Sequence, residues 1–152
     1  MTEIERIEDQ MTRAFEANAW HGPAVLEVLE AVSAEQAARR PIAAAHSIWE
    51  LVLHMTTWKD VVVRRLGGDP VKEVPPEVDF PRVTDTGAAA WTTALHGLGA
   101  THQRLLGALR SVSDDQLDQP SPGYRLSRYV LLHGVIQHDL YHAGQIAILR
   151  KG

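Results

Sequence analysis

Residues 131–149 read LLHGVIQHDLYHAGQIAIL, and their apolar and histidine positions recur at helical spacing. One set steps by three or four residues and consists of Leu131, Val135, His138, His142, Gln145 and Leu149. Because an α-helix has 3.6 residues per turn, these side chains share one face. We therefore expect a helix over about residues 126–150 that presents two imidazoles to the protein interior.

Other parts of the chain repeat this spacing, and no segment shows the sustained alternation of apolar and polar residues that is typical of strands. Further long helices are expected at about residues 2–19, 46–66 and 86–111. A short helix is expected at 23–32, with brief turns after Ser33 and Ser113. Together these segments predict an all-α fold, a four-helix bundle formed by one domain over residues 1–152.

The link between the second and third long helices, residues 67–86, is unusually long. It contains Pro70, Pro75, Pro76 and Pro81, and few runs that favour a helix. Loops of this length inside a compact domain are uncommon and usually serve as a crossover or carry function. We expect an extended crossover connection here.

A third histidine lies on the inward face of the second long helix. That face comprises Leu51, His54, Trp58, Val61 and Arg65. His138 and His142 are four residues apart, so one helix places both rings on one side for a single cation. Three neutral imidazoles converging in a bundle would leave metal positions open to substrate. The alternative is that each histidine is a hydrogen-bonded core residue.

The other histidines are less informative. His102 lies on the inward stripe of the third long helix, but parallel helices would place it roughly 12 Å from His54 along the axis. We expect a core or pocket residue there and hold it as a reserve ligand. His46 would cap its helix or line the pocket rim. His21, His96 and His133 are expected to be structural or exposed.

No residue is convincingly placed for acid–base catalysis, and three are candidates. Glu50 precedes His54 by one turn and can orient the imidazole or act as a base. Gln145 follows His142 by one turn and can hold a water, a substrate group or a partner across the core. His46 is the third candidate, from the pocket rim.

Two aromatic residues are candidates for the pocket wall, and one acidic residue needs placing. Trp58 and Tyr141 can line a pocket, although aromatic residues at helical spacing are more often packing. Asp139 adjoins His138, but charged helical residues are usually solvated, so we expect it at the surface.

The composition excludes several classes of protein. The 152 residues include no cysteine, so a metal must be held by imidazole and oxygen atoms. A net charge of −4 without a basic block argues against nucleic-acid or membrane-surface binding and favours a small-molecule substrate. The acidic N-terminus is unlike a signal peptide, and no apolar run is long enough to span a bilayer. A cytoplasmic protein is expected.

Several of these segments together resemble one family. HSIWELVLHM at residues 46–55, Trp58, VRRLG at 63–67 and HGVIQHDLYHAGQI at 133–146 strongly resemble the DinB/YfiT-like superfamily. The resemblance covers nearly the whole chain. It implies an up-down-down-up bundle, commonly a homodimer, that holds a divalent metal. Nickel or zinc is the first expectation, with iron or manganese as alternatives, and the matching ligands are His54, His138 and His142.

The resemblance also implies an activity. Relatives of assigned chemistry are metal-dependent thiol transferases and isomerases that use bacillithiol, mycothiol or glutathione, with the metal acidifying the thiol. Such a thiol would be a co-substrate here. Two alternatives stay open: a noncatalytic ligand-binding or stress-response module with a metal or an empty histidine pocket, and a hydrolase that activates water.

Overall fold

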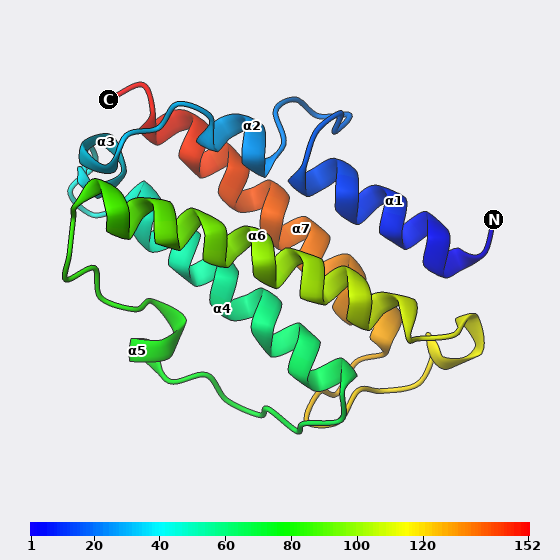
Figure 1. Ribbon diagram of the computed structural model, residues 1–152. Helices are drawn as coiled ribbons and strands as arrows, with labels where there is room; N and C mark the ends of the chain where they lie inside the picture. The colour runs from blue at the N-terminus through cyan, green and yellow to red at the C-terminus, as the bar shows by residue number, and fades with distance from the viewer.

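The computed structural model describes residues 1–152 and is all-α, with seven α-helices, one short 3₁₀ helix and no strands. The four long helices lie where the spacing of apolar residues predicts them (Figure 1). They are α1 (Glu3–Phe15), α4 (Ile48–Leu66), α6 (Ala88–Arg110) and α7 (Arg128–Leu149).

The long helices α4, α6 and α7 pack together, and α1 lies along α6 and α7. In Figure 1, α4 and α6 both run from left to right, whereas α1 and α7 run from right to left. Two consecutive long helices that run in the same direction need a connection as long as the bundle itself. The proline-rich crossover from α4 to α6 is that connection.

The first helix is shorter than the sequence predicts. It ends at Phe15, and Asn18, which lies within the predicted helix, is exposed with a φ of 66°. This left-handed conformation is one that asparagine tolerates better than most residues. The expected helix over residues 23–32 is likewise reduced to α2 (Val25–Leu29), and α3 (Ala34–Ala38) follows after the N-cap Ser33.

Hydroxyl caps set the starts of three long helices. The side chain of Thr2 accepts a hydrogen bond from the backbone N–H of Glu5, and Ser47 accepts one from that of Glu50. In both cases the glutamate returns a hydrogen bond to the backbone of the cap, which forms a capping box. Ser127 caps α7 in the simpler way. The predicted start of α4 at about residue 46 is confirmed to within two residues.

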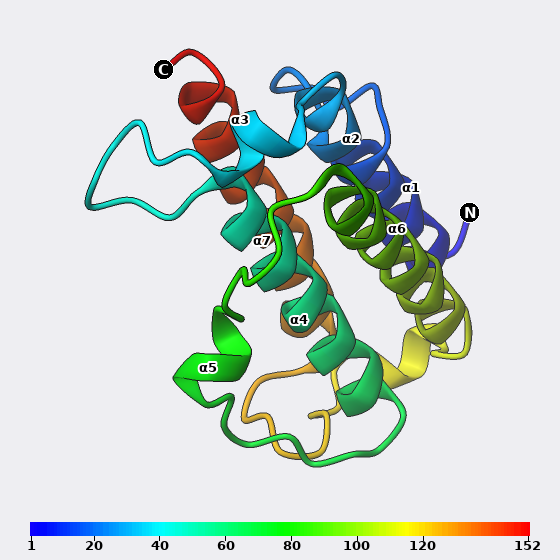
Figure 2. The same cartoon turned by 60° about the vertical axis from the view of Figure 1, so that its left-hand side comes forward.

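The crossover is not wholly extended, as we had expected it to be. It contains the short helix α5 (Pro76–Asp79), which begins where proline is tolerated because the first helical N–H groups have no partner. Figure 2 shows this connection running beside α4. The hydroxyl of Thr57 donates to the carbonyl oxygen of Val78, so α5 is held against the middle of α4.

Apolar side chains form two core clusters along the bundle. One surrounds Phe15, Met55 and Trp91, and the other surrounds Met11, Leu105 and Leu132. None of the helices combines the length and the apolar character that crossing a bilayer would require. The candidate site lies between α4 and α7, close to the point where α5 contacts α4.

Candidate metal centre

Three histidines meet between α4 and α7. The Nε2 atom of His138 lies 2.9 Å from Nε2 of His54 and 3.0 Å from Nε2 of His142. One ligand atom from each ring can be chosen so that all three lie within 4.8 Å of one another. The i, i+4 spacing on α7 thus brings two rings together, and α4 supplies the third, as the sequence stripes predict.

The outer nitrogens of two rings have acceptors that fix their tautomers. Nδ1 of His54 lies 2.9 Å from both the carbonyl oxygen and the carboxylate Oδ1 of Asp79, and Nδ1 of His142 lies 2.6 Å from Oε1 of Gln145. Acceptors at these positions require a proton on each Nδ1. In the neutral rings, both Nε2 atoms therefore carry lone pairs that point toward His138.

This donor set fits a metal ion. A proton on His138 Nε2 is the only donor that neutral rings can offer to the two facing lone pairs, and Nδ1 of His138 has no hydrogen-bond partner. A cation between the rings would satisfy three Nε2 atoms at once. Three imidazole ligands with further positions free is an arrangement that zinc and other divalent transition metals accept.

Burial favours the neutral, metal-binding form of the rings. His54 and His142 are buried, and His138 is partly buried. Burial, followed by the charges that His142 and His54 would carry, lowers the pKa of His138 to about 3. Burial also lowers the pKa of His142, although the hydrogen bond to Gln145 opposes this. His138 and His142 therefore need not lose a proton to bind a cation at neutral pH.

Two supporting residues come from the crossover and were missed by the sequence analysis. Asp79 accepts hydrogen bonds from His54 and from the indole Nε1 of Trp58, the latter at 2.7 Å. Phe80 lies between two imidazoles, with ring centroids 4.1 Å from His54 and 3.7 Å from His46. The PPEVD run signals a helix start, but no local pattern indicates which helix it contacts.

The proposed catalytic candidates lie at different positions around the triad. Glu50 is held by the backbone of Ser47, by Arg40 and by His46, and these contacts outweigh burial to lower its pKa. It forms no hydrogen bond or ion pair with His54. Gln145 supports His142 directly, whereas His46 stacks on Phe80 and is exposed.

The two aromatic candidates flank the triad. The ring of Trp58 lies 6.4 Å from His54 and 6.3 Å from His138, centroid to centroid. Tyr141 is 65% exposed, and its ring meets that of His142 edge to face, with the centroids 5.2 Å apart. Trp58 therefore lies beside the site and Tyr141 covers it from the surface.

His102 and Asp139 belong to a separate cluster in the core. Both are fully buried, as is Lys59, which donates to Asp139 and lies 3.4 Å from Nδ1 of His102. The ring of His102 stacks on Phe15 at 3.8 Å and takes no part in the triad. The expectation that Asp139 is solvated is wrong, because the ammonium of Lys59 provides a buried partner for its charge.

The last three histidines lie away from the triad. His21 and His96 are exposed, and the partly buried His133 packs against the ring of Tyr129.

Two cavities lie near the triad, one toward each end of the contact between α4 and α7. One of about 340 Å³ lies next to Gln145 and His46 and is lined mainly by apolar residues, including Ile42 and Ile148. The other, of about 190 Å³, lies next to Trp58 and His138. Of these two cavities, the second is the one lined by a triad residue, His138, so a small molecule bound there would lie beside the triad.

Comparisons with known proteins identify the family of this chain. Searches of curated proteins and of solved structures give no match. The family model described as the DinB superfamily matches residues 17–146, a range that contains His54, Asp79, His138 and His142. A match over this much of the sequence, with the predicted triad inside it, shows that the chain belongs to the DinB superfamily.

Proposed function

We propose that this protein is a metal-dependent enzyme that activates a low-molecular-weight thiol for an S-transfer or isomerisation reaction. The observation that carries the proposal is the convergence of three Nε2 atoms, two of them on rings whose Nδ1 atoms face fixed acceptors. A core histidine needs only one or two hydrogen-bond partners. Three rings that direct nitrogens at one another favour a bound cation.

Each residue of the site has a defined task in this proposal. His54, His138 and His142 hold the metal, while Asp79 and Gln145 fix the orientation of two of the rings. A divalent metal supplies a Lewis acid that lowers the pKa of a thiol. Since the chain has no cysteine, the thiol must come from a substrate. We favour zinc or nickel, with iron and manganese as alternatives.

The position of Glu50 favours thiol chemistry over hydrolysis. A hydrolase of this kind needs a free base beside the metal to take a proton from water. Glu50 instead closes the capping box of α4 and pairs with Arg40. A thiol is far more acidic than water, so its activation by a metal depends less on a protein base.

Metal content is the first test. Protein purified without an affinity tag should retain about one divalent ion per chain, and His138→Ala should lose it. His133→Ala is the matched control, because His133 lies on the same helix but outside the triad. Equal, negligible metal in wild type and His138→Ala, even after incubation with zinc or nickel, would contradict the proposal.

Turnover separates an enzyme from a binding module. The metal-loaded protein should transfer glutathione, bacillithiol or mycothiol to an electrophile such as chlorodinitrobenzene, and His138→Ala should not. Metal binding without turnover of any thiol would instead favour the noncatalytic ligand-binding alternative.

We also propose that the protein is a homodimer, as the family resemblance implies. Size-exclusion chromatography with light scattering should give twice the mass of one chain. A monomer at micromolar concentration would contradict this part of the proposal and leave the metal site unaffected.

A further inference from the structure

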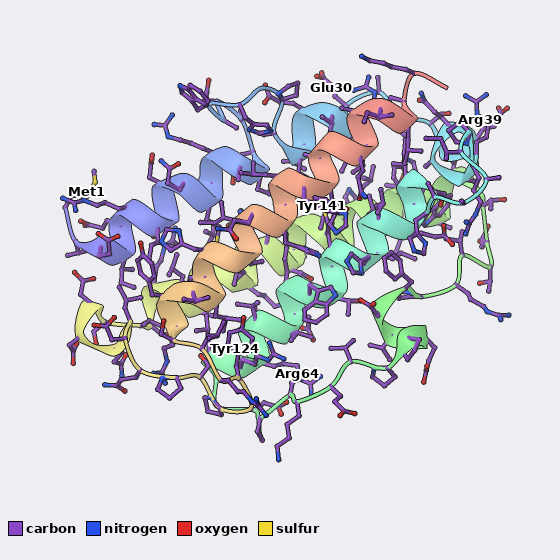
Figure 3. The ribbon with its side chains drawn as sticks, turned by 180° about the vertical axis from the view of Figure 1, so that it is seen from behind. Met1, Glu30, Arg39, Arg64, Tyr124 and Tyr141 are labelled. Carbon is purple, nitrogen blue, oxygen red and sulfur yellow. The ribbon has the colours of Figure 1, made fainter.

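A groove runs from the histidine triad toward the C-terminal end of α4. It has a volume of about 190 Å³ and lies between α4 and α7, where the loop before α7 adjoins it. In Figure 3 this loop, marked by Tyr124, lies beside the end of α4 where Arg64 is labelled. The lining residues that matter here are Trp58, Arg65, Tyr124, Gly134 and His138.

Arg65 is a buried positive charge without an acidic partner. Its side chain is only 5% exposed, and no carboxylate pairs with it. Nε donates to the carbonyl oxygen of Val71 at 3.0 Å, and the guanidinium lies 4.7 Å from the ring centroid of Tyr124. The two terminal amino groups have no hydrogen-bond partner in the protein, and neither is fully buried, so both are open to the groove. Buried charges are normally paired, so this fork is available to an anion.

The groove places Arg65 and the triad at opposite ends of one path. Arg65 follows Trp58 by seven residues on the same face of α4, which is about 10 Å along the axis. Val71 and Tyr124 hold the guanidinium at the end of the groove far from the triad, and Trp58 and His138 line the near end. A molecule that lies in the groove can therefore reach both ends.

We propose that this groove binds a carboxylate-bearing small thiol, with the carboxylate on Arg65 and the sulfur at His54, His138 and His142. This inference rests on the proposed function and names its class of substrate. A planar guanidinium with two free amino groups matches a carboxylate in a two-bond pair. The walls are otherwise mainly apolar or aromatic, and the volume is small, so a single carboxylate on a short chain fits better than a phosphate, which carries more charge.

Gly134 supplies a way to close the groove without touching Arg65. A Cβ atom added at this helical glycine would meet nothing within 4 Å, since it would point into open space. A leucine there can fill the groove while the backbone of α7 keeps its course. Gly134→Leu is therefore a blocking variant that leaves both ends of the path intact.

The first experiment tests the carboxylate end in metal-free protein. Hexanoate and hexanol are titrated by calorimetry in a buffer without carboxylates. Wild type should bind hexanoate at least tenfold more tightly than hexanol, and Arg65→Gln should lose this preference. Arg64→Gln, which changes an exposed neighbour, should match wild type, and Gly134→Leu should bind neither ligand.

Three results would overturn the proposal: equal affinity for the two ligands, an unchanged preference in Arg65→Gln, or inorganic phosphate that displaces hexanoate more strongly than acetate does. Circular dichroism checks that each variant is folded. If Arg65→Gln still binds hexanol, its groove is intact, which is a second check that the variant is folded.

The second experiment tests whether one molecule binds at Arg65 and at the triad at the same time. Cobalt(II)-loaded protein is titrated with ω-mercaptocarboxylates of increasing chain length and with mercaptoalcohols of the same lengths, and the sulfur-to-cobalt charge-transfer band reports sulfur binding. One chain length should bind at least tenfold more tightly as the carboxylate, and only when Arg65 is present.

The two proposals fail in different ways. If no thiol gives the band, thiol activation fails, and with it the substrate class, whatever the hexanoate result. If both thiol series give the band with equal affinity, the role of Arg65 is wrong and thiol activation stands.

Discussion

Two buried polar clusters lie close together in the bundle, one between α4 and α7 and the other among α4, α6 and α7. The first is the triad of His54, His138 and His142. The second consists of Lys59, His102 and Asp139. Adjacent residues of α7, His138 and Asp139, belong to different clusters, and Lys59 directly follows Trp58, which flanks the triad.

The clusters differ in whether they contain a cation. The second cluster has its own, because the ammonium of Lys59 donates to Asp139 and lies over the ring of Phe15 at 4.7 Å. The triad has three facing nitrogens and no positive charge among its neutral rings. A polar cluster that is closed by its own ion pair stabilises a core, whereas one that lacks a cation is suited to take one from outside.

The largest expected effect comes from breaking the ion pair. Lys59→Met leaves the carboxylate of Asp139 buried without its partner, which should lower the free energy of unfolding by about 3–5 kcal/mol. The Lys59→Met, Asp139→Leu double variant removes both charges and should recover most of this loss. Chemical denaturation of the metal-free proteins measures both.

Zinc retention by Lys59→Met separates the clusters. The variant should still bind zinc if it folds, because no ligand of the triad has changed. A loss below 1 kcal/mol, or a double variant no more stable than Lys59→Met, would show that the pair does not act as a closed unit.

The second effect is stabilisation by metal. Zinc at one hundred times its dissociation constant should raise the free energy of unfolding of wild type by about 2.7 kcal/mol. His142→Ala should lose this gain, whereas His102→Leu should keep it, because His102 lies in the other cluster. Thermal unfolding with and without zinc tests this, and an equal gain in both variants would place the metal elsewhere.

Each cluster also contributes a histidine that resists protonation. Burial, followed by the charge of Lys59, lowers the pKa of His102 to about 3, and burial lowers that of His138 to about 3. In the unfolded chain both take up protons near pH 6.5. The folded protein keeps both rings neutral, so the free energy of unfolding is highest above pH 6.5 and decreases as the pH falls toward 3.

Between pH 7 and pH 5, this linkage should cost metal-free protein up to about 2 kcal/mol for each of the two histidines. His102→Leu and His138→Leu should each reduce the drop in the free energy of unfolding between pH 7 and pH 5 by the part due to that histidine. Denaturation curves at the two pH values decide this. A pH dependence identical to that of wild type in both variants would contradict it.

Periodicity predicts the triad well because each ligand lies on a helix. The stripes through His54, His138 and His142 follow from 3.6 residues per turn, and the structure places all three rings together. The ends of the long helices follow from caps such as Ser47. Periodicity indicates which side of its helix a residue occupies. For the three histidines, lying on the inward side was enough to bring their rings together.

The sequence could not predict contacts between distant segments. Asp79 and Phe80 reach the triad because the crossover folds back along α4, and no local pattern records that path. Asp139 was misplaced for a related reason. A charged residue beside an inward histidine looks solvated unless its partner is known, and Lys59 is 80 positions away.

The smallest effect tests the support of the triad. Oε1 of Gln145 lies 2.6 Å from Nδ1 of His142, so Gln145→Ala should free that ring to rotate and to change its tautomer. Loss of such a partner typically weakens metal binding at least tenfold, which corresponds to about 1.4 kcal/mol. Gln137→Ala, an exposed glutamine on the same helix, is the control. Competition for zinc with a chromophoric chelator measures the change. Gln145→Glu should restore affinity, because a carboxylate accepts the same proton more strongly. If Gln145→Ala bound zinc as wild type does, the orientation of His142 would depend on packing alone.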